Sequence, residues 1–319
     1  MDWSRIGKTR QSSEFEAMNT STDWQPGAEG VFFGLPSETY HQAPGVSNSM
    51  LQHMDPPARL PAYLTEPREV TEFMIMGTLV HSMILEPDKP LPKIILQPDT
   101  YPAPPDSSLV KAKKVNVGDP IDWNNNSKYC KRWHAEAEEA GLIVLTEKRR
   151  DSLIGMVKAV STHPSARSLL MNCETEVSVF QNWTRGAGTI LRKGRMDIVP
   201  IGSNTLADVK TCDDASPEEF AKKLADGYAN QAAYYLDLWN ETNPHDQREV
   251  FVFIAVERKP PYLVSCHIVG HRTIRYCRGV NQQRLATYLE CSQTKYWPGY
   301  PTEFKTLEMS KWAFKGEEL

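Results

Sequence analysis

Two carboxylates and a lysine lie close together in the stretch GRMDIVPIGSNTLADVKT, residues 194–211. Side chains alternate between the faces of a strand, so Asp208 and Lys210 point to one face and Val209 to the other. Asp197 lies near the end of the preceding apolar run, and a hairpin at the Pro-Ile-Gly-Ser-Asn turn would bring it beside Asp208. Charges gathered in this way cost free energy unless they are paired or bind a ligand. The stretch is therefore a candidate functional site.

These side chains are of the types found in a metal-dependent nuclease centre. Two carboxylates can hold one or two hard cations such as Mg²⁺, and the Val209 carbonyl is a further oxygen at the same level. Such a cation polarises a phosphoryl oxygen and generates hydroxide at neutral pH. Lys210 can orient the water or stabilise developing negative charge. Downstream, Gln231 and Tyr235 are four residues apart, on one helical face that can reach the same site or a phosphate.

The same residues also have a purely structural interpretation. A D-x-K triplet occurs often by chance, and alone it is more typical of a salt-bridged strand pair. Gln231 and Tyr235 alone would be a polar pair at a helix–sheet boundary. The aspartate eleven residues before Asp208, together with the Gln-Tyr pair downstream, favours the nuclease centre.

The elements that must position these residues follow from the periodicity of apolar side chains. The apolar run 70–87 predicts a core helix, and Thr146 begins another helix. Strand patterns then occupy 174–184, 188–200, 205–211, 249–257 and 262–270, with helices predicted over 216–241 and 273–293. The order helix, three strands, helix, two strands, helix predicts an α/β fold with a central mixed β-sheet flanked by helices.

The chain also divides into an arm, a single domain and a long loop. Residues 1–28 are polar with little periodicity, which predicts a flexible N-terminal arm. Residues 29–319 then form one domain. Within it, a segment of about 97–128 is rich in Pro, Asp and Asn and is predicted as a long loop, of the kind that is functional or disordered.

Composition limits the classes of partner. The formal net charge is −4, so any contact with nucleic acid must be local. Taken singly, each short basic cluster is more typical of solvated surface; the clusters are Lys111, Lys113 and Lys114; Lys128, Lys131 and Arg132; Lys148, Arg149 and Arg150; and Arg192, Lys193 and Arg195. The six cysteines include no CxxC pair, which argues against a zinc ribbon or an iron–sulfur site. The polar N-terminus and the absence of an apolar run of about 20 residues predict an intracellular protein without a membrane segment.

The longer context resembles the PD-(D/E)xK nuclease superfamily and, within it, the RecE-type exonuclease (exonuclease VIII) branch. Where the superfamily name has Pro-Asp, this chain has Met196-Asp197. The matching segments follow the order of the branch over about residues 30–315 and are YHQAPGVSNSML, GTLVHSMILEP, GLIVLT, EVSVF, GRMD, ADVKT, NQAAYYLD and YWPGYPTEFKTLEMSKWA.

The resemblance implies a fold and an activity. The fold is the PD-(D/E)xK nuclease core. The activity is that of a Mg²⁺-dependent exonuclease, with Mn²⁺ able to substitute, which degrades one strand of double-stranded DNA from its 5′ end and leaves a 3′ single strand. Such enzymes act with a single-strand-annealing, RecT-like recombinase in the cytoplasm of a bacterial or phage-infected cell. Processive action also implies a homo-oligomeric ring.

The resemblance assigns roles to further residues. His81, in GTLVHSM, stands where many relatives have a metal-binding glutamate, so it is expected to join Asp197, Asp208 and the Val209 carbonyl as a metal ligand. Ser49, in SNS, corresponds to the 5′-phosphate pocket of λ-type exonucleases. The phosphate contacts expected beside it are Arg192 and Arg195, of which only Arg195 shares the strand face of Asp197, and Glu176 is expected to play a supporting role.

Two other functions remain open from the sequence. One is another DNA nuclease of the superfamily, such as a Cas4-like or helicase-associated enzyme. The other is a catalytically silent DNA-end-binding protein that loads a recombinase. Retention of all five expected catalytic residues argues against the silent scaffold; they are Asp197, Asp208, Lys210, Gln231 and Tyr235.

Overall fold

A computed structural model describes residues 24–66, 70–90 and 92–308. The predicted flexible arm, residues 1–28, lies mostly outside these ranges. Its last residues do not form a free arm, because Trp24 packs against Phe180 with the ring centroids 5.3 Å apart. Within the described ranges, no helix combines the length and the apolar character needed to cross a bilayer.

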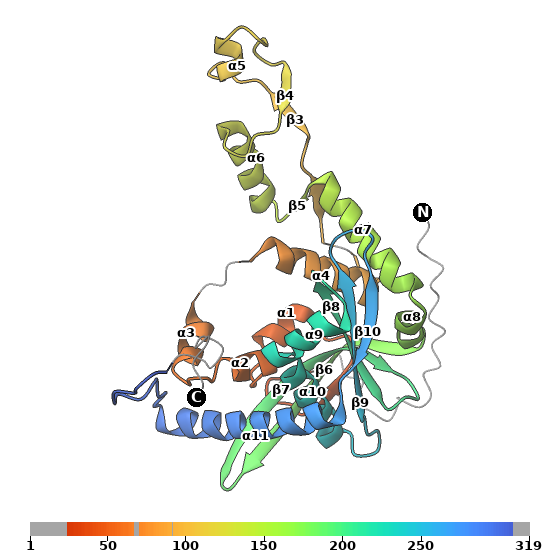
Figure 1. The fold of residues 1–319 in the computed structure, drawn as a ribbon, viewed down its shortest axis with the longest axis vertical. Helices are drawn as coiled ribbons and strands as arrows, with labels where there is room; N and C mark the ends of the chain where they lie inside the picture. Colours follow the sequence, from red (N-terminus) through yellow and green to blue (C-terminus); the bar gives the residue numbers. More distant parts are fainter. Residues whose placement is uncertain (1–23, 67–69, 91, 309–319) are drawn as a thin grey trace, which may run out of the picture.

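Helices and strands follow one another along the whole described chain, and the longest strands and the longest helix are in its second half (Figure 1). The first half contains β1 (Gly30–Phe32), α1 (Ser37–Gln42), α2 (Asn48–Gln52), α3 (Arg59–Thr65), α4 (Glu72–Leu85), β2 (Ile94–Leu96), β3 (Thr100–Pro102), α5 (Ser108–Lys111), β4 (Pro120–Asp122), α6 (Lys128–Glu139) and β5 (Ile143–Leu145). The second half contains α7 (Glu147–Thr162), α8 (Pro164–Leu170), β6 (Cys173–Arg185), β7 (Gly188–Pro200), β8 (Thr205–Cys212), α9 (Pro217–Lys223), η1 (Leu224–Tyr228), α10 (Ala229–Thr242), β9 (Val250–Glu257), β10 (Val264–Ile268) and α11 (His271–Thr294).

The central sheet has six strands in the order β1-β6-β7-β8-β9-β10. Neighbouring strands are antiparallel except for β8 and β9, which run parallel, so the predicted mixed sheet is confirmed. The turn after β7 returns the chain into β8, where Ile198 pairs with Ala207. One step along this antiparallel register, Asp197 and Asp208 occupy neighbouring positions, as the hairpin interpretation required.

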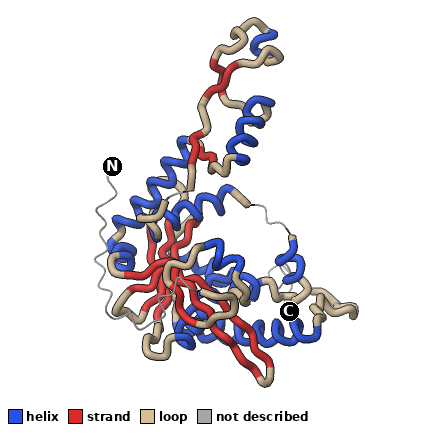
Figure 2. Tube along the Cα trace, turned by 180° about the vertical axis from the view of Figure 1, so that it is seen from behind, coloured by secondary structure: helices blue, strands red, loops and turns tan. Residues whose placement is uncertain are grey.

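Side-chain alternation along the strands builds a core on each face of the sheet. In β9, Phe251, Phe253 and Ala255 join one apolar cluster, whereas Val252, Ile254 and Val256 join the other. The first cluster contains side chains of α2, α10 and α11, and the second contains side chains of α4 and α7. The protein is therefore a sheet with helices packed on both faces, which Figure 2 shows from behind.

The helix predicted from the apolar run 70–87 is α4. It begins at the Thr71 cap, whose hydroxyl accepts a hydrogen bond from Met74 N at 3.3 Å. Its C-terminal two-thirds is core, as predicted, because Leu79, Val80 and Leu85 are buried. Its first turn is not, since Phe73 is 63% exposed. The buried part is the part that presents His81 to the sheet.

The helix predicted over 216–241 is divided by a one-turn π-helix, η1. Gly227 in this turn has φ +132°, a conformation that glycine adopts without strain. Its carbonyl accepts a hydrogen bond from Gln52 Nε2 at 3.1 Å, and a Cβ at Gly227 would lie 2.8 Å from that atom. The division sets the direction of α10, which carries Gln231 and Tyr235.

The segment predicted as a long loop, about 97–128, contains short elements of its own. β3 and β4 pair antiparallel, and α5 lies between them. A small core stabilises the module, built from Tyr101, Ala103, Ile121 and Cys130. The module is joined to the body through the parallel strands β2 and β5, and it projects beyond α4 and α7 (Figure 1). Sequence periodicity missed β3 and β4 because each is only three residues long.

Candidate nuclease active site

The candidate site is a pocket of about 800 Å³ between the central sheet and the first four helices. Strands β6 and β7 contribute Glu176, Arg195 and Asp197 to its lining. Helix α4 contributes His81, and α10 contributes Tyr235. Helix α10 packs closely on β7 at Gly194, where a Cβ would lie 2.7 Å from Leu238 and 3.2 Å from Tyr235.

His81 lies between the two hairpin strands. Its Nδ1 is 3.3 Å from Asp197 Oδ2, and its Nε2 is 2.8 Å from the Val209 carbonyl oxygen. A neutral imidazole has one N–H and can donate to only one of these two acceptors. Three of the four expected metal ligands therefore meet at this ring, namely His81, Asp197 and the Val209 carbonyl.

Glu176 completes a compact group with His81 and Asp197. One potential ligand atom from each of the three residues lies within 4.8 Å of the others. On β6, Thr175 pairs with Ile198 and Val177 with Met196, so Glu176 lies across from Asp197. Glu176 has φ +53°, a left-handed conformation that costs free energy for a residue with a side chain. The sequence suggested only a supporting role for Glu176, whereas the structure places it in the centre.

Asp208 is engaged by the two other predicted catalytic residues. Gln231 Nε2 donates to Asp208 Oδ1 at 2.6 Å, and Lys210 Nζ lies 2.7 Å from Asp208 Oδ2. The side chain of Asp208 is only 1% exposed. Among the described residues, Lys210 is the one electropositive partner of this buried oxygen. A carboxylate oxygen has two lone pairs, so Oδ2 can accept a second electropositive partner.

The charges of the site shift the pKa values of its groups. Burial, and then the negative charge of Asp208, raise the pKa of Asp197 to about 7, although His81 and Lys210 oppose the shift. Burial works to lower the pKa of Lys210, but the two aspartates outweigh it and raise that pKa, so Lys210 stays charged at neutral pH. Burial also raises the pKa of Tyr235 well above its ordinary value, so the phenol keeps its proton.

The residues present fit a divalent cation. Carboxylate and carbonyl oxygens with one imidazole nitrogen form a donor set suited to such an ion. Burial is the main cause of the raised pKa of Asp197, and the negative charge of Asp208 adds to it; a cation would neutralise that charge. The buried Asp208 Oδ2 has no electropositive partner among the described residues besides Lys210. His81, Asp197, Asp208 and the Val209 carbonyl remain the predicted ligands, and Glu176 is a candidate ligand that the sequence did not place.

The predicted phosphate contacts differ in their placement. Ser49 lines the pocket, and the α2 cap is Ser47, which accepts from Met50 N at 3.3 Å. Asn48 also lines the pocket, and its buried Oδ1 has no hydrogen-bond partner, although the sequence did not single it out. Arg195 lines the pocket as well, but its guanidinium is ion-paired with Glu176 and donates to the Leu35 carbonyl at 2.9 Å.

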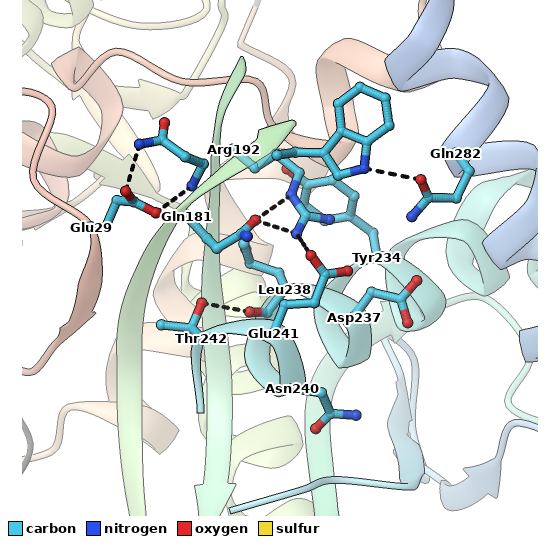
Figure 3. Close-up of polar contacts among 12 residues, drawn as sticks. Glu29, Gln181, Arg192, Tyr234, Asp237, Leu238, Asn240, Glu241, Thr242 and Gln282 are labelled. Atoms are coloured by element: carbon cyan, nitrogen blue, oxygen red, sulfur yellow. Dashed lines mark hydrogen bonds and ion pairs between the residues drawn. The ribbon is translucent and has the colours of Figure 1, made fainter. Parts of the chain in front are cut away.

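Arg192 lies away from the pocket, contrary to the expectation that it contacts a phosphate. It is 1% exposed, and Figure 3 shows its guanidinium between Gln181 and Glu241. Its Nε donates to Gln181 at 2.9 Å, and it is 2.5 Å from Glu241 Oε2. The reason is strand alternation, because Arg192 is an odd number of residues from Asp197 and points to the other face of β7. This placement gives Arg192 a structural contact in place of a phosphate contact.

Lys193, in the same basic cluster, anchors the pocket wall. Its buried ammonium donates to the carbonyls of Tyr40, His41 and Ala43 at 3.1, 3.2 and 2.6 Å. These carbonyls are at the end of α1, where a cation is favourable. Lys193 therefore fixes the loop between α1 and α2 that leads to Ser49.

The mixed sheet, with carboxylates and a lysine on the neighbouring strands β7 and β8, defines an α/β protein of the PD-(D/E)xK type. The chain belongs to the family described as "PDDEXK-like domain of unknown function (DUF3799)", whose model matches residues 47–308.

Solved structures are similar in fold. A crystal structure named "Putative exonuclease" from Eubacterium rectale has a TM-score of 0.52 and 10% identity, over 88% of this chain and 98% of that chain. A phage related exonuclease from Haemophilus somnus 129PT has 13% identity over 59% of this chain and 90% of that chain. Its TM-score of 0.27 is too low to establish a common fold. No curated protein matches the chain. The comparisons therefore establish the family and the fold.

Proposed function

We propose that the protein is a divalent-metal-dependent exonuclease that degrades one strand of duplex DNA from its 5′ end and leaves a 3′ single strand. The observation that carries the proposal is the meeting of His81, Glu176 and Asp197 in the lining of one pocket, with the Asp208–Lys210 ion pair on β8, the strand next to Asp197. A salt-bridged strand pair alone would need neither the histidine nor a third carboxylate.

Each residue has a defined task in the proposed reaction. A divalent cation, Mg²⁺ with Mn²⁺ as a substitute, would supply Lewis-acid polarisation of the phosphodiester when bound. His81, Asp197, Asp208 and the Val209 carbonyl would hold it. Lys210 stabilises the negative charge that develops on the phosphoryl group, since it remains protonated beside Asp208.

The two residues of α10 have different tasks. Gln231 fixes the carboxylate of Asp208 through its hydrogen bond of 2.6 Å. Tyr235 lines the pocket with a protonated phenol, which can donate a hydrogen bond to a phosphate or a bound water.

The proposed preference for a 5′ end rests on the part of the pocket wall that α2 forms. Ser49 and Asn48 present a hydroxyl and an amide to the same cavity as Arg195. These are groups that recognise phosphate oxygens, and Lys193 holds the loop that leads into α2, the helix that carries the first two. A terminal 5′-phosphate at this wall would place the first phosphodiester toward Asp197.

The proposal includes a setting for the reaction. Motifs that resemble the RecE-type branch support a role in single-strand-annealing recombination with a RecT-like recombinase in the bacterial cytoplasm. A homo-oligomeric ring that encloses the duplex would let an acidic protein remain on a polyanion. The recombinase and the ring are both proposed from the resemblance.

End-labelled DNA tests the direction of cleavage. Linear duplex labelled at the 5′ or at the 3′ end is incubated with Mg²⁺, and a covalently closed circle of the same sequence is the control. We expect early release of the 5′ label, late release of the 3′ label and an intact circle. Cleavage of the circle would assign the site to another type of DNA nuclease. Binding of linear ends without release of either label would assign it to a silent loader.

A further inference from the structure

The module that projects from the body is built as a separate unit. Residues 97–141 contain β3, α5, β4 and α6, and they surround the small core of Tyr101, Ala103, Ile121 and Cys130. The strands β2 and β5 form the stalk on which this module stands (Figure 1). The stalk begins at Ile94, eight residues after Glu86, which lines the active-site pocket. The module is therefore attached close to the candidate active site.

The structure separates the basic clusters of the sequence by whether their charges are already paired. In the α7 cluster (Lys148, Arg149 and Arg150), Arg149 is ion-paired with Glu72 and Arg150 with Asp151. On β7, Arg192 and Arg195 are ion-paired with Glu241 and Glu176.

The two clusters on the projecting module are different. The α5 cluster (Lys111, Lys113 and Lys114) and the α6 cluster (Lys128, Lys131 and Arg132) are exposed. Among the described residues, the only ion pair in these two clusters is between Arg132 and Glu136. The five lysines therefore keep their positive charge for an outside partner.

Charge is unevenly distributed along the module. Residues 107–134 contain six lysine or arginine residues and two aspartates, in a protein whose net charge is −4. Helix α6 begins at this basic end, with Ser127 as its cap, so its positive dipole end adds to the field. The acidic residues Glu136, Glu138 and Glu139 are at the other end of α6, toward the stalk.

We propose that the basic end of this module binds the sugar–phosphate backbone of the duplex at a distance from the cleaved end. The inference rests on the proposed function, because it takes the substrate to be duplex DNA. Lysines act as point charges without the fixed fork of arginine, so they suit a regular polyanion contacted without sequence preference. Helix α6, with 12 residues, is about 18 Å long, which corresponds to about five base pairs.

The test compares two triple variants by DNA binding with Ca²⁺ in place of Mg²⁺. In the first variant the α5 cluster is changed to glutamine at all three positions. In the matched control the α7 cluster is changed in the same way, so that both lose three positive charges. Fluorescence anisotropy gives the affinity for blunt duplexes of 6 and 30 base pairs over a range of salt concentrations, and circular dichroism checks that each variant is folded.

We expect the α5 variant to lose about tenfold in affinity for the 30-base-pair duplex and none for the 6-base-pair duplex. Its slope of log K against log salt should fall by about two to three, because each lost phosphate contact removes about 0.9. The α7 variant should change less than twofold on either duplex.

Several outcomes would overturn the inference. If the α5 variant keeps wild-type affinity and slope on the long duplex, the module does not contact DNA, and the proposed function is left intact. Poly-glutamate at charge-matched concentration is a competitor for the 30-base-pair duplex. If it displaces the duplex from the wild type but not from the α5 variant, the module binds an acidic protein instead. If the wild type binds neither duplex, both the proposed function and the contact of the module with DNA are overturned.

Discussion

Replacing Lys210 by methionine removes one ammonium from the site and keeps the apolar stem. The Lys210 ammonium lies 2.7 Å from Asp208 Oδ2, and it is 5.2 Å from the centre of the Tyr228 ring. Methionine can keep the packing against that ring. The variant therefore isolates the charge of Lys210, and it should change the rate of cleavage more than the affinity for DNA.

Two magnitudes follow from the structure. Loss of one preorganised electrostatic group costs about 10²- to 10³-fold in turnover, or roughly 3–4 kcal/mol of transition-state stabilisation. Loss of one partner of a buried ion pair costs about 3–5 kcal/mol of folding free energy. The lower value is expected here, because Gln231 still donates to Asp208. For a chain of this size, about 3 kcal/mol lowers the Tm by roughly 6 °C.

Single-turnover cleavage with Mg²⁺, DNA affinity with Ca²⁺ and thermal unfolding measure the three quantities. Lys222→Met is the matched control, since Lys222 forms an ion pair with Glu219 on the exposed side of α9. The control should leave all three near the wild-type values. The reasoning is wrong if Lys210→Met keeps its turnover. A large loss of affinity with unchanged turnover would make Lys210 a phosphate anchor.

Three other predictions concern the remaining groups of the site. Ser49→Ala should reduce the preference for 5′-phosphorylated over 5′-hydroxyl ends about tenfold, measured as relative kcat/KM, and a wild type without that preference would exclude the pocket. Because the pKa of Asp197 is about 7 and a cation must displace its proton, Mn²⁺ affinity measured by calorimetry should rise about fivefold from pH 6 to pH 7 and about tenfold from pH 6 to pH 8, and level off above pH 8; a flat profile would contradict this. Arg192→Met should lower the free energy of unfolding by about 2 kcal/mol, because it removes the hydrogen bonds to Gln181 and Glu241 while the half-exposed Glu241 can be hydrated; turnover should change little, and a stable but inactive variant would return Arg192 to the site.

The central hairpin could be predicted from the sequence because its signals are local. Alternation of faces fixed Asp208 and Lys210 on one side, and the Pro-Ile-Gly-Ser-Asn turn placed Asp197 beside them. The same alternation sets Arg192, five residues before Asp197, on the other face of the strand. The expectation that Arg192 contacts a phosphate rested on its closeness to Asp197 in the sequence and not on the strand pattern.

Other features depend on contacts that no local pattern encodes. Glu176 reaches the centre through its left-handed backbone and the pairing of β6 with β7. The kink at Gly227 is matched to Gln52, a residue 175 positions away. The position of His81 came from the resemblance, because periodicity alone would make it a residue of a core helix.

Nucleotide release from uniformly labelled linear duplex tests the central claim most directly. Wild type is compared in Mg²⁺ and in EDTA with Asp208→Asn, which keeps the shape of the buried side chain and removes its charge. We predict release by the wild type that requires Mg²⁺, and a loss of at least 10³-fold in the folded variant, which should still bind duplex in Ca²⁺. Release by Asp208→Asn at a rate close to that of the wild type, or release by the wild type in EDTA, would contradict the assignment of this site.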